Sequence, residues 1–99
     1  MTITEIKNFI DDYNFKLDKN FSTKMTQRFY KSIGNDIKIY IVLRQLHNTL
    51  YFLLTYKNEN IDISSNREFT RVNEIYLKSR IDSINKFIFS YKKIFDYMN

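Results

Sequence analysis

The sequence predicts an α+β domain of two layers, in which two helices pack on a three- to four-stranded antiparallel sheet in the order α-β-β-β-α. Two patterns predict this class. Alternating apolar runs at residues 37–43 and 50–56 are typical of a β-hairpin, and an amphipathic helical pattern then extends from Asn66 to Met98. The chain has 99 residues and no internal repeat or linker, so we expect a single domain over residues 1–99.

A first helix is predicted over residues 3–17. Thr2 and Glu5 have the spacing of a capping box, in which each side chain accepts a hydrogen bond from the backbone N–H of the other residue. The apolar residues that follow fall on one helical stripe, which comprises Ile3, Ile6, Ile10, Tyr13 and Leu17. We expect the helix to bury this stripe against the sheet.

The first strand is expected between this helix and the turn at 34–36, which holds the only glycine of the chain. Met25, Phe29 and Ile33 supply its apolar positions. Successive residues of a strand point to opposite faces, so the length of the turn decides the orientation of the strand. A three-residue turn places Phe29 and Ile33 on the apolar face and three polar residues on the other, namely Lys24, Arg28 and Tyr30. A two-residue turn reverses the two faces of this strand.

The next two strands are predicted to pair through a two-residue loop at His47 and Asn48. In that register the strongest apolar residues share one face, in three facing pairs: Leu43 and Phe52, Ile41 and Leu54, and Ile39 and Tyr56. We expect both helices to cover this face. The opposite face carries a mixture of cationic, aromatic and apolar side chains, namely Lys38, Tyr40, Val42, Arg44, Tyr51, Leu53, Thr55 and Lys57.

The long C-terminal helix is predicted to begin at a second capping box, formed by Ser65 and Glu68. Before it, residues 61–63 form either a short fourth strand or the tail of the third. A helix over 66–98 is about 50 Å long, whereas a seven-residue strand covers only about 23 Å. We therefore expect the helix to overhang the sheet, and its end to pack on the first helix, fold back at a kink, or meet another subunit.

The composition excludes several classes of function. The absence of cysteine excludes disulfides, thiolate catalysis and zinc ribbons, and His47 is the only histidine. We see no carboxylate placed beside His47, no phosphate loop, no cluster of metal ligands and no activated nucleophile. We therefore expect a protein that is not an enzyme and uses no cofactor or metal. The apolar runs of five residues are too short for membrane insertion, so we expect a cytoplasmic location.

The chain is basic, with a net charge of +5. Residues 16–57 carry eight Lys and Arg against two Asp, which gives this stretch alone a charge of +6. The chain also lacks Ala, Pro and Trp and is rich in Ile, Asn, Lys, Tyr and Phe, the amino acids of A- and T-rich codons. We infer an AT-rich genome, and the lysine content is expected to reflect this codon usage in part.

The polar face of the sheet is the first candidate binding surface. Cations that neutralise phosphates alternate there with rings on which bases can stack, as in single-strand binders. Direct DNA or RNA binding would use Lys24, Arg28, Lys38, Arg44, Lys57, Tyr30 and Tyr40. Lys and Tyr are equally common on solvated sheet faces, and the adjacent Val42 and Leu53 indicate a covered surface instead. A protein partner on this face would contact Tyr40, Arg44, Tyr51 and Leu53.

The back of the long helix is the second candidate surface. Four cations recur there at intervals of seven and eight residues, namely Arg71, Lys78, Lys86 and Lys93. Asp82 interrupts this row, and any solvated helix presents charges opposite its apolar stripe. Ile75 and Phe89 lie on the same side, and we expect Phe89 to anchor a protein partner.

The predicted order of elements resembles that of the double-stranded-RNA-binding domain over about residues 3–90. In that family a Lys-rich stretch opens the last helix, and this helix is rich in Ala. Here Ser65-Asn66-Arg67-Glu68 opens the helix, and the chain contains no Ala. The resemblance is one of topology, and it assigns no residue a role.

The sequence thus favours a small interaction protein that blocks or regulates a protein or nucleoprotein complex. In size and composition it resembles proteins carried by phages and other mobile elements, among them anti-CRISPR proteins, which cover a functional surface of a host complex. Its 8 Tyr and 9 Phe supply more aromatic surface than one small core ordinarily hides. Direct DNA or RNA binding is the alternative from another class, and self-association as a homodimer is a third expectation.

Overall fold

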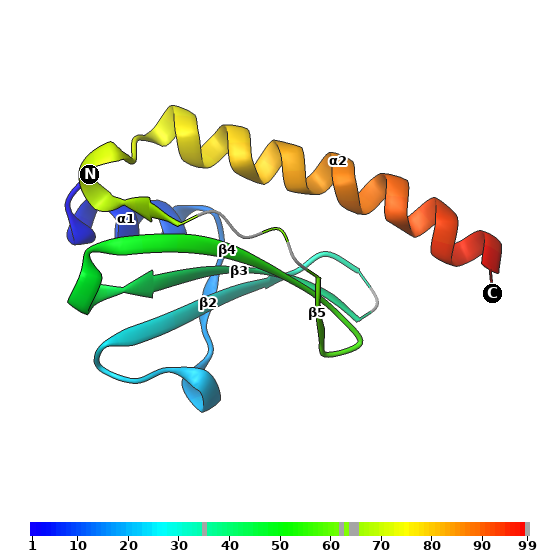
Figure 1. Cartoon of the computed structure of the whole chain (residues 1–99), viewed down its shortest axis with the longest axis horizontal. Helices are drawn as coiled ribbons and strands as arrows, with labels where there is room; N and C mark the ends of the chain where they lie inside the picture. Colours follow the sequence, from blue (N-terminus) through cyan, green and yellow to red (C-terminus); the bar gives the residue numbers. More distant parts are fainter. Residues whose placement is uncertain (35, 62, 64–65, 99) are drawn as a thin grey trace.

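The computed structural model contains an antiparallel sheet with both helices on one side of it (Figure 1). Its three central strands are β2 (Thr26–Ser32), β3 (Ile37–Arg44) and β4 (Thr49–Tyr56), which pair in that order. The helices are α1 (Ile3–Asp12) and α2 (Glu74–Met98). The structure describes residues 1–34, 36–61, 63 and 66–98. The α+β class and the order α-β-β-β-α are confirmed.

Three short strands extend the sheet beyond the three or four strands predicted. β1 (Lys16–Leu17) pairs with β2 at one edge, whereas β5 (Glu59–Ile61) and β6 (Arg67–Glu68) both pair with β4 at the other. The turn between β4 and β5 consists of Lys57 and Asn58, which have φ angles of 51° and 65°. Two successive positive φ angles are typical of a type I′ hairpin turn. Residues 59–61 therefore form a separate strand, and Asp62 lies outside the described residues.

The central hairpin has the predicted faces but not the predicted partners. Ile41 pairs with Phe52 and Ile39 with Leu54, two residues away from the register that a loop at His47 and Asn48 implies. The loop is longer than predicted because residues 45–47 form a 3-10 turn, η2 (Gln45–His47), and Asn48 adopts a left-handed conformation with φ 51°. A shift of two residues leaves every side chain on its face.

The turn between β2 and β3 is the three-residue alternative. The N–H of Ile33 donates to the carbonyl of Ile37 over 3.0 Å, and Phe29 pairs with Ile41. Gly34 supplies a φ of +133°, which suits glycine, and Asn35 lies outside the described residues. Phe29 therefore faces the helices, whereas Arg28 and Tyr30 point to the opposite side of the sheet.

α1 begins as predicted but ends five residues early. The capping box of Thr2 and Glu5 is present, with both side chains bonded to the backbone N–H of the other residue. At the other end Asn14 takes a φ of 63°, and the N–H groups of Asn14 and Phe15 donate to the carbonyls of Asp11 and Ile10. This is a Schellman motif, which turns the chain out of the helix. The prediction that Leu17 belongs to the helical stripe is wrong, because Leu17 lies in β1.

α2 begins at Glu74, so the prediction that it starts at residue 66 is wrong. The side-chain Oδ1 of Asn73 accepts a hydrogen bond of 2.7 Å from the N–H of Tyr76, which makes Asn73 the N-cap. Ser65, the predicted cap, lies outside the described residues, and Glu68 belongs to β6. Phe69 lies in a 3-10 turn, η3 (Phe69–Arg71), and it is buried there together with Val72.

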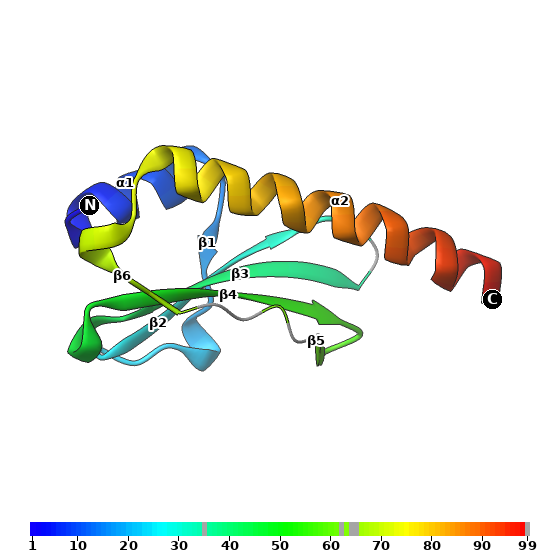
Figure 2. The ribbon, with the colours of Figure 1, turned by 45° about the horizontal axis from the view of Figure 1, so that its top comes forward.

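The end of α2 overhangs the sheet, as predicted. α2 has 25 residues, which makes it about 37 Å long, and it continues as one helix past the edge of the sheet in both views (Figure 1, Figure 2). It does not fold back on α1, which lies near the other end of α2. Side chains beyond Ser90 lie outside the described part of the chain, including that of Lys93.

The core fills the space between the helices and the inner face of the sheet. Ile6 and Ile10 from α1 and Leu77 and Ile84 from α2 are buried there. The sheet contributes alternate residues of β3 and β4, namely Ile37, Ile39, Ile41, Leu43, Leu50, Phe52 and Leu54. The predicted apolar face is thus the buried one. Within the described ranges, no helix combines the length and hydropathy needed to cross a membrane.

Candidate nucleic-acid interface

The outer face is the side of the sheet that points away from α1 and α2. Residues that lie directly opposite each other in antiparallel strands share a face, so Lys16, Tyr30, Tyr40 and Leu53 form one row across four strands. The outer face consists of Lys16, Arg28, Tyr30, Lys38, Tyr40, Val42, Arg44, Tyr51, Leu53 and Thr55. It holds four cations, and Glu68 of β6, which lies opposite Thr49 in the same row as Arg44, adds one carboxylate at the end of the sheet near the β3–β4 loop.

The middle of the outer face is less accessible than the sequence suggests. Val42 is fully buried, and Tyr40 and Thr55 each expose only 7% of their surface. Arg44, Tyr51 and Leu53 are half-buried. The chain itself therefore covers much of the apolar centre that the sequence offers to a protein partner, while Lys16 is exposed and Arg28, Tyr30 and Lys38 are half-buried.

The segment 18–23 forms a wall along the open edge of β2. It contains a 3-10 turn, η1 (Lys19–Phe21), which lies on the side of the sheet opposite the helices (Figure 1). The N–H of Asp18 donates to the carbonyl of Arg28 over 2.8 Å, and the N–H of Arg28 donates to the hydroxyl of Ser22 over 3.0 Å. These bonds occupy the edge of β2 where another strand would otherwise add. A strand from another molecule therefore cannot add to β2 at Arg28.

Cations and aromatic rings are in contact on the outer face. The guanidinium of Arg28 lies 5.7 Å from the centroid of the Phe21 ring, and Nζ of Lys38 lies 5.2 Å from that of Tyr30. The rings of Tyr30 and Tyr40 are 6.2 Å apart. Cation–π contacts of this length hold long side chains in place with their charges near the surface. The cations and rings of the outer face are thus in contact with each other in pairs, Arg28 with Phe21 and Lys38 with Tyr30.

A hollow of about 250 Å³ opens on the outer face between η1 and the β4–β5 hairpin. Tyr40 and Thr55 form its buried floor. Its walls are Phe21 and Arg28 on one side and Asn58 and Asn60 on the other, with the Phe21 side chain 63% exposed. An exposed ring, a cation and two amides thus surround one small space.

The structure separates some of the residues that the sequence placed together. Lys24 is exposed in the loop before β2, outside the strand. Lys57 is in the β4–β5 turn, and its Nζ lies 5.4 Å from the centroid of Tyr56, a ring that packs against the core. The expectation that Lys57 extends the cationic face is therefore wrong. Phe89 is 64% exposed on α2, and this helix lies on the side of the sheet opposite η1 (Figure 1).

Four residues of the interface escaped the sequence argument, because they lie outside the three predicted strands. Lys16 belongs to the unexpected strand β1, Phe21 to η1, and Asn58 and Asn60 to the β4–β5 hairpin. The one available signal was the pair Lys57-Asn58 after an apolar run, because Asn favours tight turns. Nothing in the sequence indicates that Phe21 lies beside Arg28.

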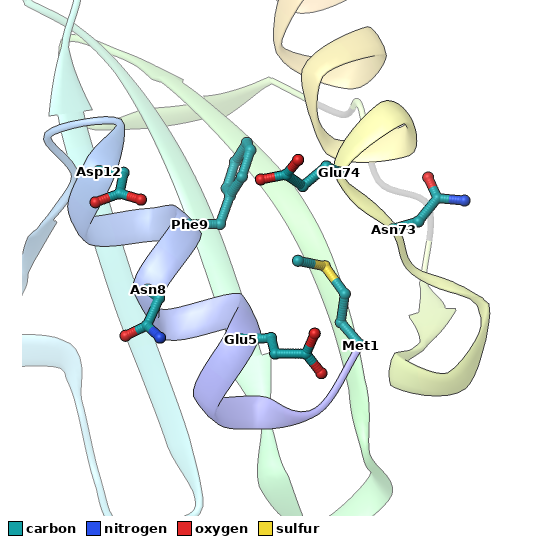
Figure 3. A pocket seen from close by; sticks show the side chains of 7 residues that line it. All are labelled: Met1, Glu5, Asn8, Phe9, Asp12, Asn73 and Glu74. Atoms are coloured by element: carbon teal, nitrogen blue, oxygen red, sulfur yellow. The ribbon is translucent and has the colours of Figure 1, made fainter.

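A second hollow, of about 440 Å³, lies between α1 and the start of α2 and has the opposite electrostatic character (Figure 3). Met1 and Glu74 turn toward Phe9 in this view, and carboxylates of Glu5, Asp12 and Glu74 line the space. The hydrogen bond from the backbone N–H of Thr2 lowers the pKa of Glu5, which keeps this carboxylate charged. Three carboxylates repel phosphate, so this hollow does not suit nucleic acid.

Comparisons with known protein families, with curated proteins and with solved structures give no significant match to this chain. In the part of the chain that the structure describes, no three His, Asp or Glu side chains are grouped so as to hold a metal ion.

Proposed function

We propose that this chain is a binding protein without catalytic activity, and that its outer face binds single-stranded DNA or RNA. One observation carries the proposal: Arg28 and Lys38 lie against aromatic rings beside a hollow that an exposed ring, Phe21, helps to wall. Single-strand binders combine cations that follow the phosphates with rings on which the bases stack. The outer face offers cations and aromatic rings side by side.

The cations of the outer face set the scale of the electrostatic attraction. Lys16, Arg28, Lys38 and Arg44 lie on three neighbouring strands, where an extended strand of nucleic acid can follow them. Each phosphate contacted on a single strand releases about 0.7 of a counterion, so four contacts give a log–log slope of affinity against salt of about −3. The acidic hollow lies beside α1, on the helix side of the sheet, and it repels nucleic acid. This repulsion favours an approach of nucleic acid from the side of the outer face.

The test is the binding of a short fluorescent single-stranded oligonucleotide, measured by anisotropy between about 50 and 200 mM salt. We expect a slope near −3 for the natural chain, and Lys38→Gln should reduce it by about 0.7. The matched control is Lys78→Gln, which removes an exposed cation from α2 and should leave the slope unchanged. Failure to bind at low salt, or equal effects of the two substitutions, would reject the proposal.

A second candidate function is that of an inhibitor which covers a protein or nucleoprotein complex, including the host defence complexes that phage proteins block. The exposed residues of α2 favour it: Ile75 and Phe89 are 80% and 64% exposed. They lie on the solvent side, opposite the buried Leu77 and Ile84. Apolar side chains of this size are the anchors that protein interfaces use.

This candidate is tested with the surface charge of the outer face left intact. The double substitution Ile75→Glu and Phe89→Glu should abolish capture of a protein partner from the host while oligonucleotide affinity is retained. Unchanged capture of the partner would reject this candidate, and loss of oligonucleotide binding in this variant would show that α2, and not the outer face alone, takes part in nucleic-acid binding. A second copy of this chain is one such partner, which sedimentation of both forms detects. We also propose a cytoplasmic location, since a chain without cysteine fits a reducing compartment.

A further inference from the structure

The hollow on the outer face differs chemically from the rest of that face. Among the described residues that line it, Arg28 is the only charged one, and the guanidinium of Arg28 already lies over the Phe21 ring. The other lining groups are neutral, namely Phe21, Tyr40, Thr55, Asn58 and Asn60. A phosphate would find one cation here and three or four along the open face, so the hollow suits a neutral group attached to an anionic chain.

The two amides determine which neutral group fits. Each Asn side chain carries two N–H donors and a carbonyl acceptor side by side. Adjacent donors and acceptors are also what the edge of a nucleobase presents, and Asn is a common partner of such edges. The exposed Phe21 ring lies across the same space and offers a face for stacking. A sugar can also pack on a ring and bond to amides, but the cations of the surrounding outer face favour a group that is attached to phosphates.

We propose that this hollow receives one unpaired nucleobase, stacked on Phe21 and hydrogen-bonded by Asn58 and Asn60, while the phosphates on either side contact the cations of the outer face. This inference rests on the proposed function and deepens it. Binding along the face is then indifferent to sequence, and the hollow is the point at which the protein discriminates one base from another. A base held in a duplex cannot enter, so the site selects single strands or ends.

The test compares a normal oligonucleotide with an abasic one of the same length and charge. Removing one base–aromatic stack weakens binding about ten- to hundredfold. We therefore expect Phe21→Ala to weaken binding of the normal oligonucleotide by this factor and to leave the abasic one unchanged. Phe89→Ala is the matched control, because Phe21 and Phe89 are 63% and 64% exposed, and it should change neither affinity.

A second variant keeps the inference testable if the loss of Phe21 disturbs η1. Asn60→Ala removes one amide from an exposed position of β5 and leaves the ring in place. Affinities for homopolymers of different bases should differ in the natural chain and become nearly equal in this variant. If Phe21→Ala weakens normal and abasic oligonucleotides alike, or if neither substitution changes base preference, the hollow is not a base site although the face still binds. If the natural chain binds neither oligonucleotide at low salt, the proposed function itself fails.

Discussion

The guanidinium of Arg28 lies 5.7 Å from the centroid of the Phe21 ring, and this pair joins the η1 wall to a central strand of the sheet. A planar guanidinium can stack on a ring and bind phosphate through its edge at the same time, which an ammonium cannot do. Phe21 is 63% exposed, so the contact orders a ring that would otherwise be free to rotate in solvent. Arg28 therefore has two roles in the proposed interface, one in positioning Phe21 and one in charge.

Substitutions of Arg28 separate these two roles. Arg28→Lys keeps the charge, so the salt slope of oligonucleotide binding should stay near −3, but affinity should fall several-fold because Phe21 is less well positioned. Arg28→Gln should lose more affinity than Arg28→Lys, because the phosphate contact is lost as well, and about 0.7 of the slope. Anisotropy titrations at several salt concentrations measure both quantities. Identical behaviour of the Lys variant and the natural chain would show that only the charge matters.

The second prediction concerns stability and follows from the buried residues of the β3–β4 hairpin. Ile41 and Phe52 pair across the two central strands, and both are fully buried. Phe52→Ala should destabilise the fold by about 3–5 kcal/mol, because it removes a large apolar side chain and leaves a cavity. Leu46→Ala is the control, since Leu46 is 67% exposed at the tip of the same hairpin and its loss should cost under about 0.5 kcal/mol. Urea unfolding measures both values, and similar costs would contradict the burial of Phe52.

The fold was predictable wherever side-chain periodicity decides it. The residues of the hairpin lie on the predicted inner and outer faces although the predicted register is wrong, because the loop is longer than predicted by an even number of residues. Element ends were not predictable from periodicity. Asn14 ends α1 through a left-handed conformation that its sequence neighbours do not signal. Phe69 continues the apolar helical spacing toward α2, although it is buried from a 3-10 turn.

The candidate site was predictable only in its strand residues. Period two put Lys38 with Tyr40 on one face of a strand and Arg28 with Tyr30 on one face of its neighbour. The sequence left open whether these two faces coincide, and the three-residue turn makes them coincide. Periodicity gives the face on which a side chain lies, but it does not give the exposed fraction of that side chain. Other segments of the chain decide the exposure, and Tyr40 is buried although it lies on the outer face. The hollow depends on loops that curl over the outer face, and contacts between distant loops leave no local pattern in the sequence.

The start of α2 gives a third prediction. Asn73 caps the helix by accepting the N–H of Tyr76, so Asn73→Ala should lower the free energy of unfolding by about 1 kcal/mol. Asn66→Ala is the matched control, because Asn66 is exposed and stands where the apolar pattern of the sequence begins. Urea unfolding with unchanged slope measures the difference. Equal costs at Asn66 and Asn73 would contradict the role of Asn73 as the N-cap.

The turn between β4 and β5 holds a residue that does not suit its conformation, which gives a fourth prediction. Lys57 has a φ of 51°, where Asn is preferred and an ordinary L residue is strained. Lys57→Asn should therefore stabilise the fold by about 1 kcal/mol. Asn58→Ala tests the neighbouring position with φ 65° and should destabilise it. Because the cation of Lys57 lies over Tyr56, Lys57→Asn should change the salt slope of oligonucleotide binding less than Lys38→Gln does.

The capping box of α1 gives a fifth prediction, on the pH dependence of stability. The pKa of Glu5 is lowered in the folded chain, first by the hydrogen bond from the backbone N–H of Thr2 and then by the Thr2 side chain. A carboxyl group with a lowered folded pKa stabilises the fold above its unfolded pKa, which is about 4.3 for Glu. This contribution is lost as the pH falls through the folded pKa, because the proton then binds equally to both states.

Glu5→Gln isolates that contribution, because glutamine keeps an oxygen for the Thr2 N–H but does not titrate. At neutral pH the natural chain should be the more stable of the two, and the difference should shrink as the pH falls below about 4.3. Urea midpoints of both proteins across this range measure it, and the other carboxyl groups cancel in the comparison. A stability difference that stays constant down to low pH would mean that the charge of Glu5 contributes nothing to the cap, and that the bond to Thr2 acts only as a neutral hydrogen bond.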